Sequence, residues 1–330
     1  MQSTIDTLLS AQTDDARHSA SALASFVSKQ HSEVAFSHTL TIAGQALTGH
    51  LLAGALSALA HCFTPVSIAF HALHQQFGDD VVEVRGNLES VEREVLNKTL
   101  SGVSTSFNID VGVQGERPRL DTPGLLVMDM DSTVIAIECI DEIAKLAGVG
   151  EQVAEVTAKA MRGEIAFNDS LVHRVACLEN VPVAHLAQIR DSIPLMPGIQ
   201  VLLSTLKQHK WKLAIASGGF TYFADYLKER LGLDYAISNT LEISEGNLTG
   251  KVVGEIVNAD VKARTVETLA REWSIPCSQT VAMGDGANDL VMMAQSALGV
   301  ACHGKPLVNE KADVAIRVGS LHSMLYFLGS

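Results

Sequence analysis

The sequence predicts an α/β protein with a doubly wound parallel sheet, preceded by a smaller α+β domain. After residue 197, short apolar runs alternate with helical patterns, which is typical of a parallel sheet covered by helices. Residues 34–115 show the order β-α-β-β-α-β, which is the split unit of a ferredoxin-like domain. The chain has 330 residues, 47% of them apolar, so it is long enough for more than one hydrophobic core.

The composition argues against two classes of partner. The chain carries 24 basic and 37 acidic residues, a formal charge of −13, which disfavours nucleic acid and membrane surfaces. Its longest apolar stretch, 46–60, is interrupted by polar residues and is too short to span a bilayer. The five cysteines show no disulfide or metal-ligand spacing, and the first residues do not resemble a signal peptide. We therefore expect a cytoplasmic protein.

The first domain is predicted at 34–115, after a polar N-terminal extension at 1–33. Its hydrophobic periodicity predicts four strands and two helices. In chain order these are strand His38–Ile42, helix Leu47–His61, strands Pro65–Leu73 and Asp80–Gly86, helix Leu88–Leu100, and strand Ser104–Val111. A linker rich in Pro, Gly and charged residues follows at 114–124 and leads into a second domain at 122–330.

The second domain opens with the apolar run LLVM at 125–128, predicted to be a buried strand. Residues 138–193 show consecutive helical patterns without a strand, which indicates a helical insertion. Residues 241–253 contain Glu-Gly-Asn and predict a hairpin. The other predicted elements are helices Gly198–His209, Thr221–Leu231, Lys262–Trp273 and Ala287–Ala294, and strands Lys212–Ala216, Tyr235–Asn239, Thr280–Met283, Ala297–Val300 and Val314–Ile316.

Polar clusters follow three of the predicted strands. Asp129 and Asp131 come after LLVM, Ser-Gly-Gly at 217–219 follows KLAIA, and GDGAND at 284–289 follows TVAM. Lys262 opens a helix between the second and third clusters. Because the carboxyl ends of parallel strands meet at one edge of a sheet, we expect these groups to converge there.

Together these residue types favour phosphate chemistry. Asp129 and Asp285 offer oxygen ligands for a hard cation such as Mg²⁺, and a carboxylate can also act as a nucleophile. The Ser217 hydroxyl and the Gly218 amide can donate to phosphate oxygens. Taken alone, each cluster has a plainer interpretation: a loop, a turn, or a short calcium-like loop without its distal Glu.

Two further groups complete the predicted chemistry. Lys262 can neutralise charge that builds up on phosphoryl oxygens. Asp131 can protonate a leaving alkoxide and then activate water.

The combination DMDST, SGGF, Lys262 and GDGAND resembles the four motifs of the haloacid dehalogenase superfamily of phosphohydrolases. The resemblance runs from about 122 to 330 and includes the helical insertion. Glu138 and the run FNDSLVHR at 167–174 resemble the Mg²⁺-dependent branch that hydrolyses O-phospho-L-serine, the final step of serine biosynthesis. The implied fold is a haloacid dehalogenase core with a helical cap at about 138–193.

The resemblance implies a role for each matched residue. It implies Asp129 as the nucleophile, which forms an aspartyl phosphate, and Asp131 as the general acid and base. It also implies that Asp129, the Asp131 carbonyl and Asp285 bind Mg²⁺, with Asp289 supporting the metal shell. Ser217, Gly218 and Lys262 would bind the phosphate group, and Asn288 would help to position the substrate.

The cap would recognise a zwitterionic amino acid. Glu138 would pair with the substrate ammonium group, and Arg174 would clamp its carboxylate. Met161 and Phe167 would form the wall of the pocket. A surface ion pair for Arg174 and a core position for the two apolar residues are the plainer alternatives.

The first domain resembles the ACT fold that accompanies many enzymes of amino-acid metabolism. This resemblance implies ligand sensing or a homodimer through that domain, and a purely structural appendage is the alternative. Two other functions remain open for the whole chain. One is a phosphotransferase acting on homoserine or another small alcohol, and the other is an amino-acid-binding regulator without turnover.

Overall fold

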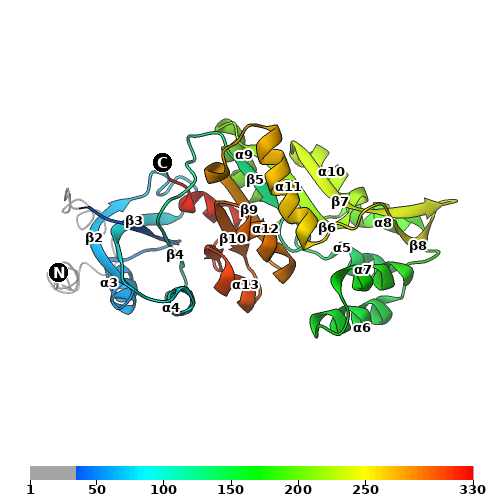
Figure 1. Cartoon of the computed structure of the whole chain (residues 1–330), viewed down its shortest axis with the longest axis horizontal. Coiled ribbons are helices and arrows are strands. Elements are labelled where there is room, and N and C mark those ends of the chain that lie inside the picture. Colours follow the sequence, from blue (N-terminus) through cyan, green and yellow to red (C-terminus); the bar gives the residue numbers. More distant parts are fainter. Residues whose placement is uncertain (1–34, 330) are drawn as a thin grey trace. The chain divides into compact units, whose positions relative to one another are not determined.

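The structure is a computed structural model that describes residues 35–329 (Figure 1). The predicted extension at 1–33 lies outside the described residues. The chain divides into two compact units, one of residues 35–121 and 300–329 and one of residues 122–299. The sequence analysis placed residues 300–330 in the second domain, at 122–330. These domain limits remain a prediction.

The first unit contains an antiparallel sheet with the strand order β2-β3-β1-β4, which confirms the ferredoxin-like arrangement. Its elements are β1 (His38–Gly44), α3 (Gly49–Leu59), β2 (Phe63–Phe70), β3 (Asp80–Leu88), α4 (Arg93–Phe107) and β4 (Asp110–Gln114). The prediction of a strand at 104–111 is wrong for its first half, because α4 continues to Phe107. Asn108 then ends the helix in a left-handed conformation, with its N–H bonded to Ser104 O.

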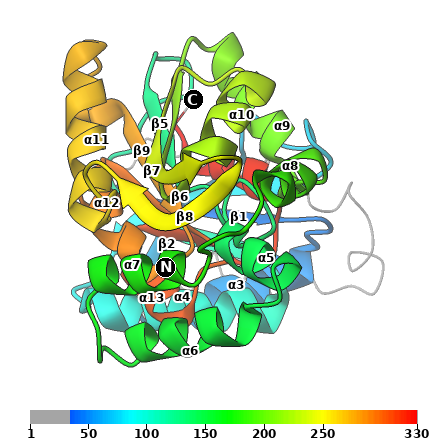
Figure 2. The same ribbon diagram turned by 90° about the vertical axis from the view of Figure 1, so that its right-hand side faces the viewer.

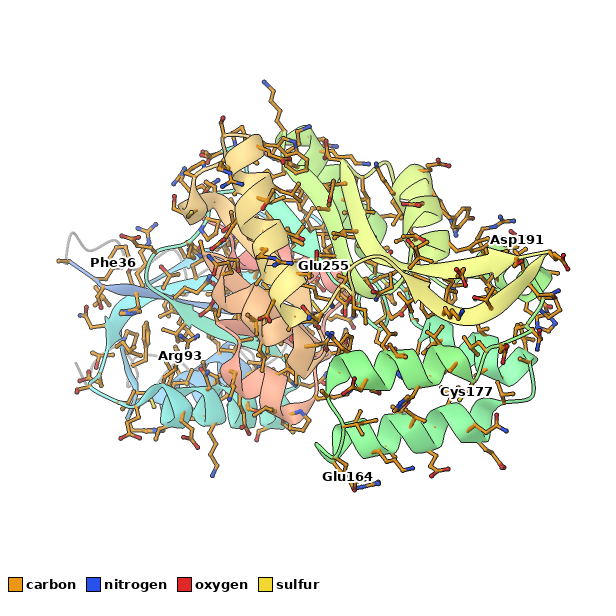
Figure 3. All side chains as sticks on the ribbon, turned by 45° about the vertical axis from the view of Figure 1, so that its right-hand side comes forward. Phe36, Arg93, Glu164, Cys177, Asp191 and Glu255 are labelled. Atoms are coloured by element: carbon orange, nitrogen blue, oxygen red, sulfur yellow. The ribbon has the colours of Figure 1, made fainter. Side chains whose placement is uncertain are left out.

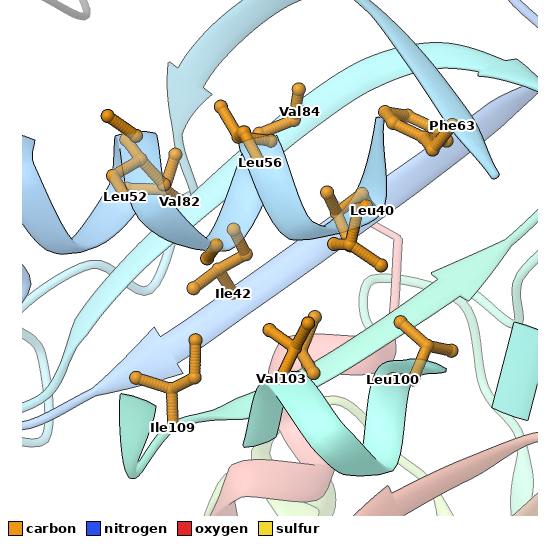
Figure 4. Close-up of a cluster of buried hydrophobic side chains, with 14 of the residues drawn as sticks. Leu40, Ile42, Leu52, Leu56, Phe63, Val82, Val84, Leu100, Val103 and Ile109 are labelled. Atoms are coloured by element: carbon orange, nitrogen blue, oxygen red, sulfur yellow. The ribbon is translucent and has the colours of Figure 1, made fainter. Parts of the chain in front are cut away.

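The two helices bury one face of this sheet. Leu52 and Leu56 of α3 and Val103 of α4 pack with strand residues such as Ile42 and Val84 (Figure 4). Alternation along the strands places these side chains on one face. The burial of this apolar face is the main contribution to the stability of the unit.

The edge strand β4 is bonded to residues near the end of the chain, within the same unit. This part of the chain contains α13 (Pro306–Lys311), β11 (Val314–Ile316) and a 3₁₀ helix at Leu321–Phe327, and the bonded residues 317–319 lie between β11 and the 3₁₀ helix. The buried carboxylate of Asp110 accepts the backbone N–H groups of residues 317, 318 and 319 at 2.7–3.0 Å. Gln114 donates to the carbonyl of Phe327 at 3.1 Å. The first unit therefore joins segments far apart in the sequence.

The second sheet has seven strands in the order β11-β10-β9-β5-β6-β7-β8. Its further strands are β5 (Leu125–Met128), β6 (Lys212–Phe220), β7 (Tyr235–Ser244), β8 (Asn247–Val253), β9 (Thr280–Gly284) and β10 (Leu298–Cys302). β9, β5, β6 and β7 are parallel. β7 and β8 form the predicted hairpin, whose turn residues Glu245 and Gly246 both have positive φ.

Helices cover both faces of the parallel strands, as expected for a doubly wound sheet. α11 (Ala259–Glu272) and α12 (Leu290–Ala294) lie on one side of the strands, and α9 (Ile199–Gln208) and α10 (Thr221–Leu231) lie on the other (Figure 2). The predicted α/β fold class is confirmed. None of the helices within residues 35–329 combines the length and apolar character that crossing a membrane requires.

The insertion between β5 and β6 is helical, as predicted. It contains α5 (Cys139–Leu146), α6 (Gly150–Met161), α7 (Phe167–Ala176) and α8 (Val183–Asp191). Figure 3 labels Glu164 at the turn between α6 and α7 and Cys177 after the other end of α7. Asn180 and Val183, after α7, bond to the backbone of the β7–β8 hairpin.

Candidate active site

The predicted polar clusters converge at the carboxyl edge of the sheet because their strands are neighbours in register. Met128 of β5 lies opposite Ile215 of β6 and Met283 of β9. The residues that follow these three positions therefore run toward the same edge of the sheet. This places Asp129, the Ser217 loop and the Asp285 loop side by side.

Lys262 is the centre of a buried ion network. It is fully buried on α11, and its Nζ lies 2.9 Å from Asp129 Oδ1 and 2.8 Å from Asp289 Oδ1. Burial alone lowers the pKa of Lys262, but the charges of Asp129 and Asp289 outweigh it and raise that pKa above its ordinary value. Lys262 therefore carries a positive charge next to the Asp129 carboxylate.

Asp289 holds Lys262 in place. Its Oδ1 accepts from Lys262 and its Oδ2 accepts the backbone N–H of Gly286 at 3.0 Å. Burial and the charge of Asp129 raise the pKa of Asp289, while Lys262 and Gly286 oppose the rise. A Cβ at Gly284 would lie 2.3 Å from this carboxyl group, so glycine is required there. Asp289 thus connects the GDGAND loop to α11.

Asp131 has the environment of a proton donor. Burial, then the charges of Glu138 and Asp129, raise its pKa well above the ordinary value, against hydrogen bonds from Cys139. Its Oδ1 is buried and has no hydrogen-bond partner within the described chain. A Cβ at Gly219 would lie 2.9 Å from its Oδ2, so glycine at 219 allows the 217–219 segment to approach Asp131 closely.

A tight turn after β5 aims the two aspartates. The carbonyl of Met130 accepts the N–H groups of residues 133, 134 and 135, and Ser132 takes a positive φ of 56°. The Ser132 hydroxyl donates to Glu138 Oε1 at 2.7 Å. Glu138, at the start of the cap, is therefore tied to the loop that carries Asp129 and Asp131.

Three carboxylates could hold a metal ion. Oxygens of Asp129, Asp285 and Asp289 all lie within 4.8 Å of one another. Both carboxylate oxygens of Asp289 accept hydrogen bonds, from Lys262 and from Gly286, whereas Lys262 and the Met130 N–H both contact Oδ1 of Asp129. The Oδ2 atom of Asp129 is therefore better placed than Asp289 to bind a metal ion. Carboxylate oxygens suit a hard divalent cation, so the donor set fits the predicted kind of metal.

The cap brings Phe167 and Arg174 of α7 toward the site. A Cβ at Gly218 would lie 3.1 Å from the Phe167 ring, which shows that this ring packs against the Ser-Gly-Gly segment at 217–219. Burial lowers the pKa of Arg174, while the charges of Asp141, Glu138 and Asp131 raise it. The Nε of Arg174 is buried without a hydrogen-bond partner within the described residues. Arg174 therefore faces the acidic side of the site.

Two further predicted residues add less to the geometry. Asn288 is half-buried in the GDGAND loop, where a Cβ at Gly286 would lie 2.3 Å from its Oδ1. The side chain of Met161 lies outside the described residues. Arg162, the next residue, forms an exposed ion pair with Glu164.

Sequence reasoning missed two side chains that support the site. Cys139 hydrogen-bonds to Asp131 through its backbone and its thiol. The Thr133 hydroxyl lies 3.5 Å from Asp285 Oδ1. The position of Thr133 within the DMDST motif could have marked it as a site residue. Nothing in the sequence pattern distinguishes Cys139 from a cysteine of the hydrophobic core.

Comparisons with known proteins agree with this geometry. The family model for haloacid dehalogenase-like hydrolases matches residues 124–297. A phosphoserine phosphatase from Vibrio cholerae is 53% identical over 251 residues, which are 76% of this chain and 74% of that protein. The unliganded crystal structure of a probable phosphoserine phosphatase from Vibrio cholerae superposes with a TM-score of 0.72 at 45% identity, over 88% of this chain and 86% of that one.

A third match bears on the chemistry. A structure described as a phospho-aspartyl intermediate analogue of phosphoserine phosphatase has a TM-score of 0.60 at 38% identity, over 63% of this chain and 99% of that one. The fold, the gathered motifs and these matches lead to one assignment. The chain belongs to the haloacid dehalogenase-like hydrolases, in the phosphoserine phosphatase family.

Proposed function

We propose that this chain hydrolyses O-phospho-L-serine to L-serine and phosphate in two steps, with Asp129 as the nucleophile. The observation that carries the proposal is the pair formed by Asp129, beside the buried cation of Lys262, and Asp131, whose pKa is raised. One carboxylate can attack while the other still carries a proton. The names of the related proteins support the substrate.

In the first step, an Asp129 oxygen attacks phosphorus and the bond from phosphorus to the serine oxygen breaks. Asp131 gives its proton to the departing serine oxygen. In the second step, Asp131 takes a proton from water, the resulting hydroxide attacks phosphorus, and the bond to Asp129 breaks. Asp131 is then protonated again and inorganic phosphate leaves.

The phosphoryl group would be held by Lys262, the Ser217 hydroxyl and the Gly218 N–H, and Asn288 would help to position the substrate. Asp129, the Asp131 carbonyl and Asp285 would hold Mg²⁺, which supplies positive charge to the phosphoryl oxygens when bound. The fit rests on the close approach of the carboxylate oxygens of Asp129, Asp285 and Asp289, which lie within 4.8 Å of one another.

The substrate's amino-acid part would be recognised by the cap. The buried Nε of Arg174 lacks a partner within the described residues, and a substrate carboxylate would satisfy it. The Glu138 carboxylate, oriented by Ser132, would accept from the substrate ammonium group. Phe167, which packs over Gly218, would limit the access of water to the phosphoryl group.

The test is phosphate and serine release from O-phospho-L-serine, with Mg²⁺ and with EDTA. We expect turnover only with the metal. Acid quenching with ³²P-labelled substrate should leave label on the parent protein and none on Asp129→Asn. Transfer of phosphate to added homoserine instead of water would favour a phosphotransferase, and an unlabelled parent protein would contradict the covalent mechanism.

We also propose a cytoplasmic location and a homodimer through the ferredoxin-like unit. The acidic composition supports the location, and the edge position of β2 in the order of its sheet supports the dimer. Light scattering of the full chain and of a variant with proline substitutions on β2 would test the dimer.

A further inference from the structure

Asn239 is a buried side chain of β7 that connects two parts of the active site. It is 1% exposed and lies opposite Phe220 in the pairing of β6 with β7. The pairing is regular up to Ala216 and resumes only at Phe220. The intervening residues, 217–219, are the phosphate loop, so this loop leaves the ladder of backbone bonds between the two strands.

The side-chain amide of Asn239 binds the segment 217–219, where the backbone bonds between β6 and β7 are interrupted. Its Nδ2 donates to the carbonyl of Gly218 at 2.8 Å, and its Oδ1 accepts the N–H of Val257 at 2.9 Å. A carbonyl on one side and an N–H on the other allow only one orientation of the amide. The bond to Val257 is buried and the bond to Gly218 is partly buried, which makes the loss of either costly.

The bond to Gly218 also orients the Ser217 hydroxyl. The peptide between Gly218 and Gly219 is held at both ends, because its carbonyl accepts from Asn239 and its N–H donates to Ser217 Oγ at 2.9 Å. With one acceptor site of Oγ occupied by this N–H, the hydroxyl proton is directed elsewhere. That arrangement suits donation to a phosphate oxygen.

The bond to Val257 reaches the helix that carries Lys262. Val257 precedes Asn258, whose side chain caps α11 by accepting the N–H groups of Asp260 and Val261 at 3.1 Å. Lys262 is the next residue of that helix. Figure 3 labels Glu255 in the connection from β8 to α11, which the Asn239 bond anchors.

We propose that Asn239 is a positioning residue for phosphoryl transfer, which fixes the Ser217–Gly218 loop relative to the Lys262 helix. The inference rests on the proposed function in that these groups bind the phosphoryl oxygens. Asn239 does not itself touch the substrate. Its loss should weaken phosphate binding and slow every phosphate ester, whatever the leaving group.

The test compares Asn239→Asp and Asn239→Leu with the parent enzyme. Asn239→Asp keeps the size and the bond to Val257 but places an oxygen against the Gly218 carbonyl. We expect kcat/KM to fall about 10- to 100-fold for O-phospho-L-serine and for an aryl phosphate alike. The inhibition constant of inorganic phosphate should rise in parallel.

Asn97→Leu is the matched control. Asn97 is a buried asparagine of the first unit whose Nδ2 donates to a backbone carbonyl, that of Glu310, at 2.6 Å. Its loss should lower the melting temperature while leaving phosphate inhibition unchanged. If Asn239→Asp lowers the melting temperature but leaves kcat/KM and phosphate inhibition at parent values, Asn239 is structural only and the proposal is overturned.

Two measurements keep the outcome clear. A parent enzyme that hydrolyses the aryl phosphate but not O-phospho-L-serine would contradict the proposed substrate, and Asn239 would be tested on the aryl phosphate and by calorimetric titration with inorganic phosphate. If the variants do not fold, amide hydrogen exchange in the parent protein tests the role of Asn239. The Val257 and Gly219 amides should be protected as strongly as the amides of core strands. Fast exchange at both would refute the positioning role.

Discussion

At the scale of single residues, the site depends on how charge is distributed among buried groups. Lys262 stands between two carboxylates that would repel each other without it. The sequence predicted that Lys262, near the start of a helix, reaches the edge of the sheet at which Asp129 follows a strand. From the motif, Asp289 was expected to support the metal shell, whereas in the structure it binds Lys262. The motif could not predict this contact, because the partner of a buried lysine depends on rotamers and distances.

The first prediction concerns this network. Lys262→Met should lower the free energy of unfolding by about 3–5 kcal/mol, because it leaves Asp289 and Asp129 buried without their cation. Asp289→Asn added to it should cost less than the sum of the single changes. Urea denaturation at neutral pH measures all three variants.

Lys212→Met is the control, since the Lys212–Asp234 pair is partly exposed. Its cost should stay below about 1 kcal/mol. Strictly additive effects of Lys262→Met and Asp289→Asn would show that the network is not coupled.

At the scale of elements, periodicity predicted the strands best where both faces are buried. β5 and β9 agree with their predicted bounds to within one residue because they are short apolar runs between turn residues, whereas β6 continues beyond its predicted end at Ala216 to Phe220. Helix α4 was placed too early, since its polar last turns resemble an alternating strand. Leu96, Leu100, Val103 and Phe107 face the core at helical spacing, and this packing overrides the weak helix propensity of Ser104 and Thr105.

The second prediction belongs to α7. Arg174→Ala should lower kcat/KM for O-phospho-L-serine by about 10- to 100-fold, as expected for the loss of a hydrogen-bonded charge. The kcat/KM for an aryl phosphate, which has no carboxylate to bind, should change little. Arg162→Ala, which removes an exposed arginine near the other end of the cap helices, should affect neither substrate. Steady-state kinetics with both substrates decide, and equal losses on the two would contradict the carboxylate clamp.

The third prediction concerns His71, which follows β2. Its Nδ1 accepts the Leu73 N–H at 3.0 Å and its Nε2 lies 3.4 Å from the Leu328 carbonyl, so the neutral ring with a proton on Nε2 satisfies both. Burial is the main cause that lowers the pKa of His71, against the charge of Glu83. The unfolded chain therefore binds this proton more readily, and stability falls as the pH drops below about 6.5.

His71→Asn keeps an acceptor for the Leu73 N–H but cannot be protonated. Thermal unfolding between pH 7.5 and 5 should show a smaller acid loss of stability in this variant than in the parent. The difference cannot exceed about 1.4 kcal/mol per pH unit for one proton. Identical pH profiles for the two proteins would exclude His71 as a contributor.

At the scale of the whole molecule, the fold holds like charges together and so should gain stability from a counter-ion. The chain carries a formal charge of −13, and three carboxylates gather at one point of the sheet edge. A cation that binds only the folded chain raises its stability by mass action. The motif order predicted this cluster, whereas the grouping of residues 300–329 with the first unit had no sequence signal.

The fourth prediction follows from that cluster. Mg²⁺ at 100 times its dissociation constant should stabilise the full chain by about 2.7 kcal/mol relative to EDTA, seen as a higher melting temperature. NaCl of equal ionic strength should give a smaller shift, and Asp285→Asn should remove most of the Mg²⁺ effect. An undiminished shift in Asp285→Asn would place the cation elsewhere.

The bonds from Asp110, Gln114 and His71 to residues 317–328 have a consequence for biosynthesis. A ribosome completes the ferredoxin-like sheet long before it translates the segment that satisfies these polar groups. Until then, water must serve as their partner, and the nascent first unit stays less stable than in the finished protein. Arrest of translation before codon 300 should therefore yield an emerging chain that proteases cut readily within residues 35–121.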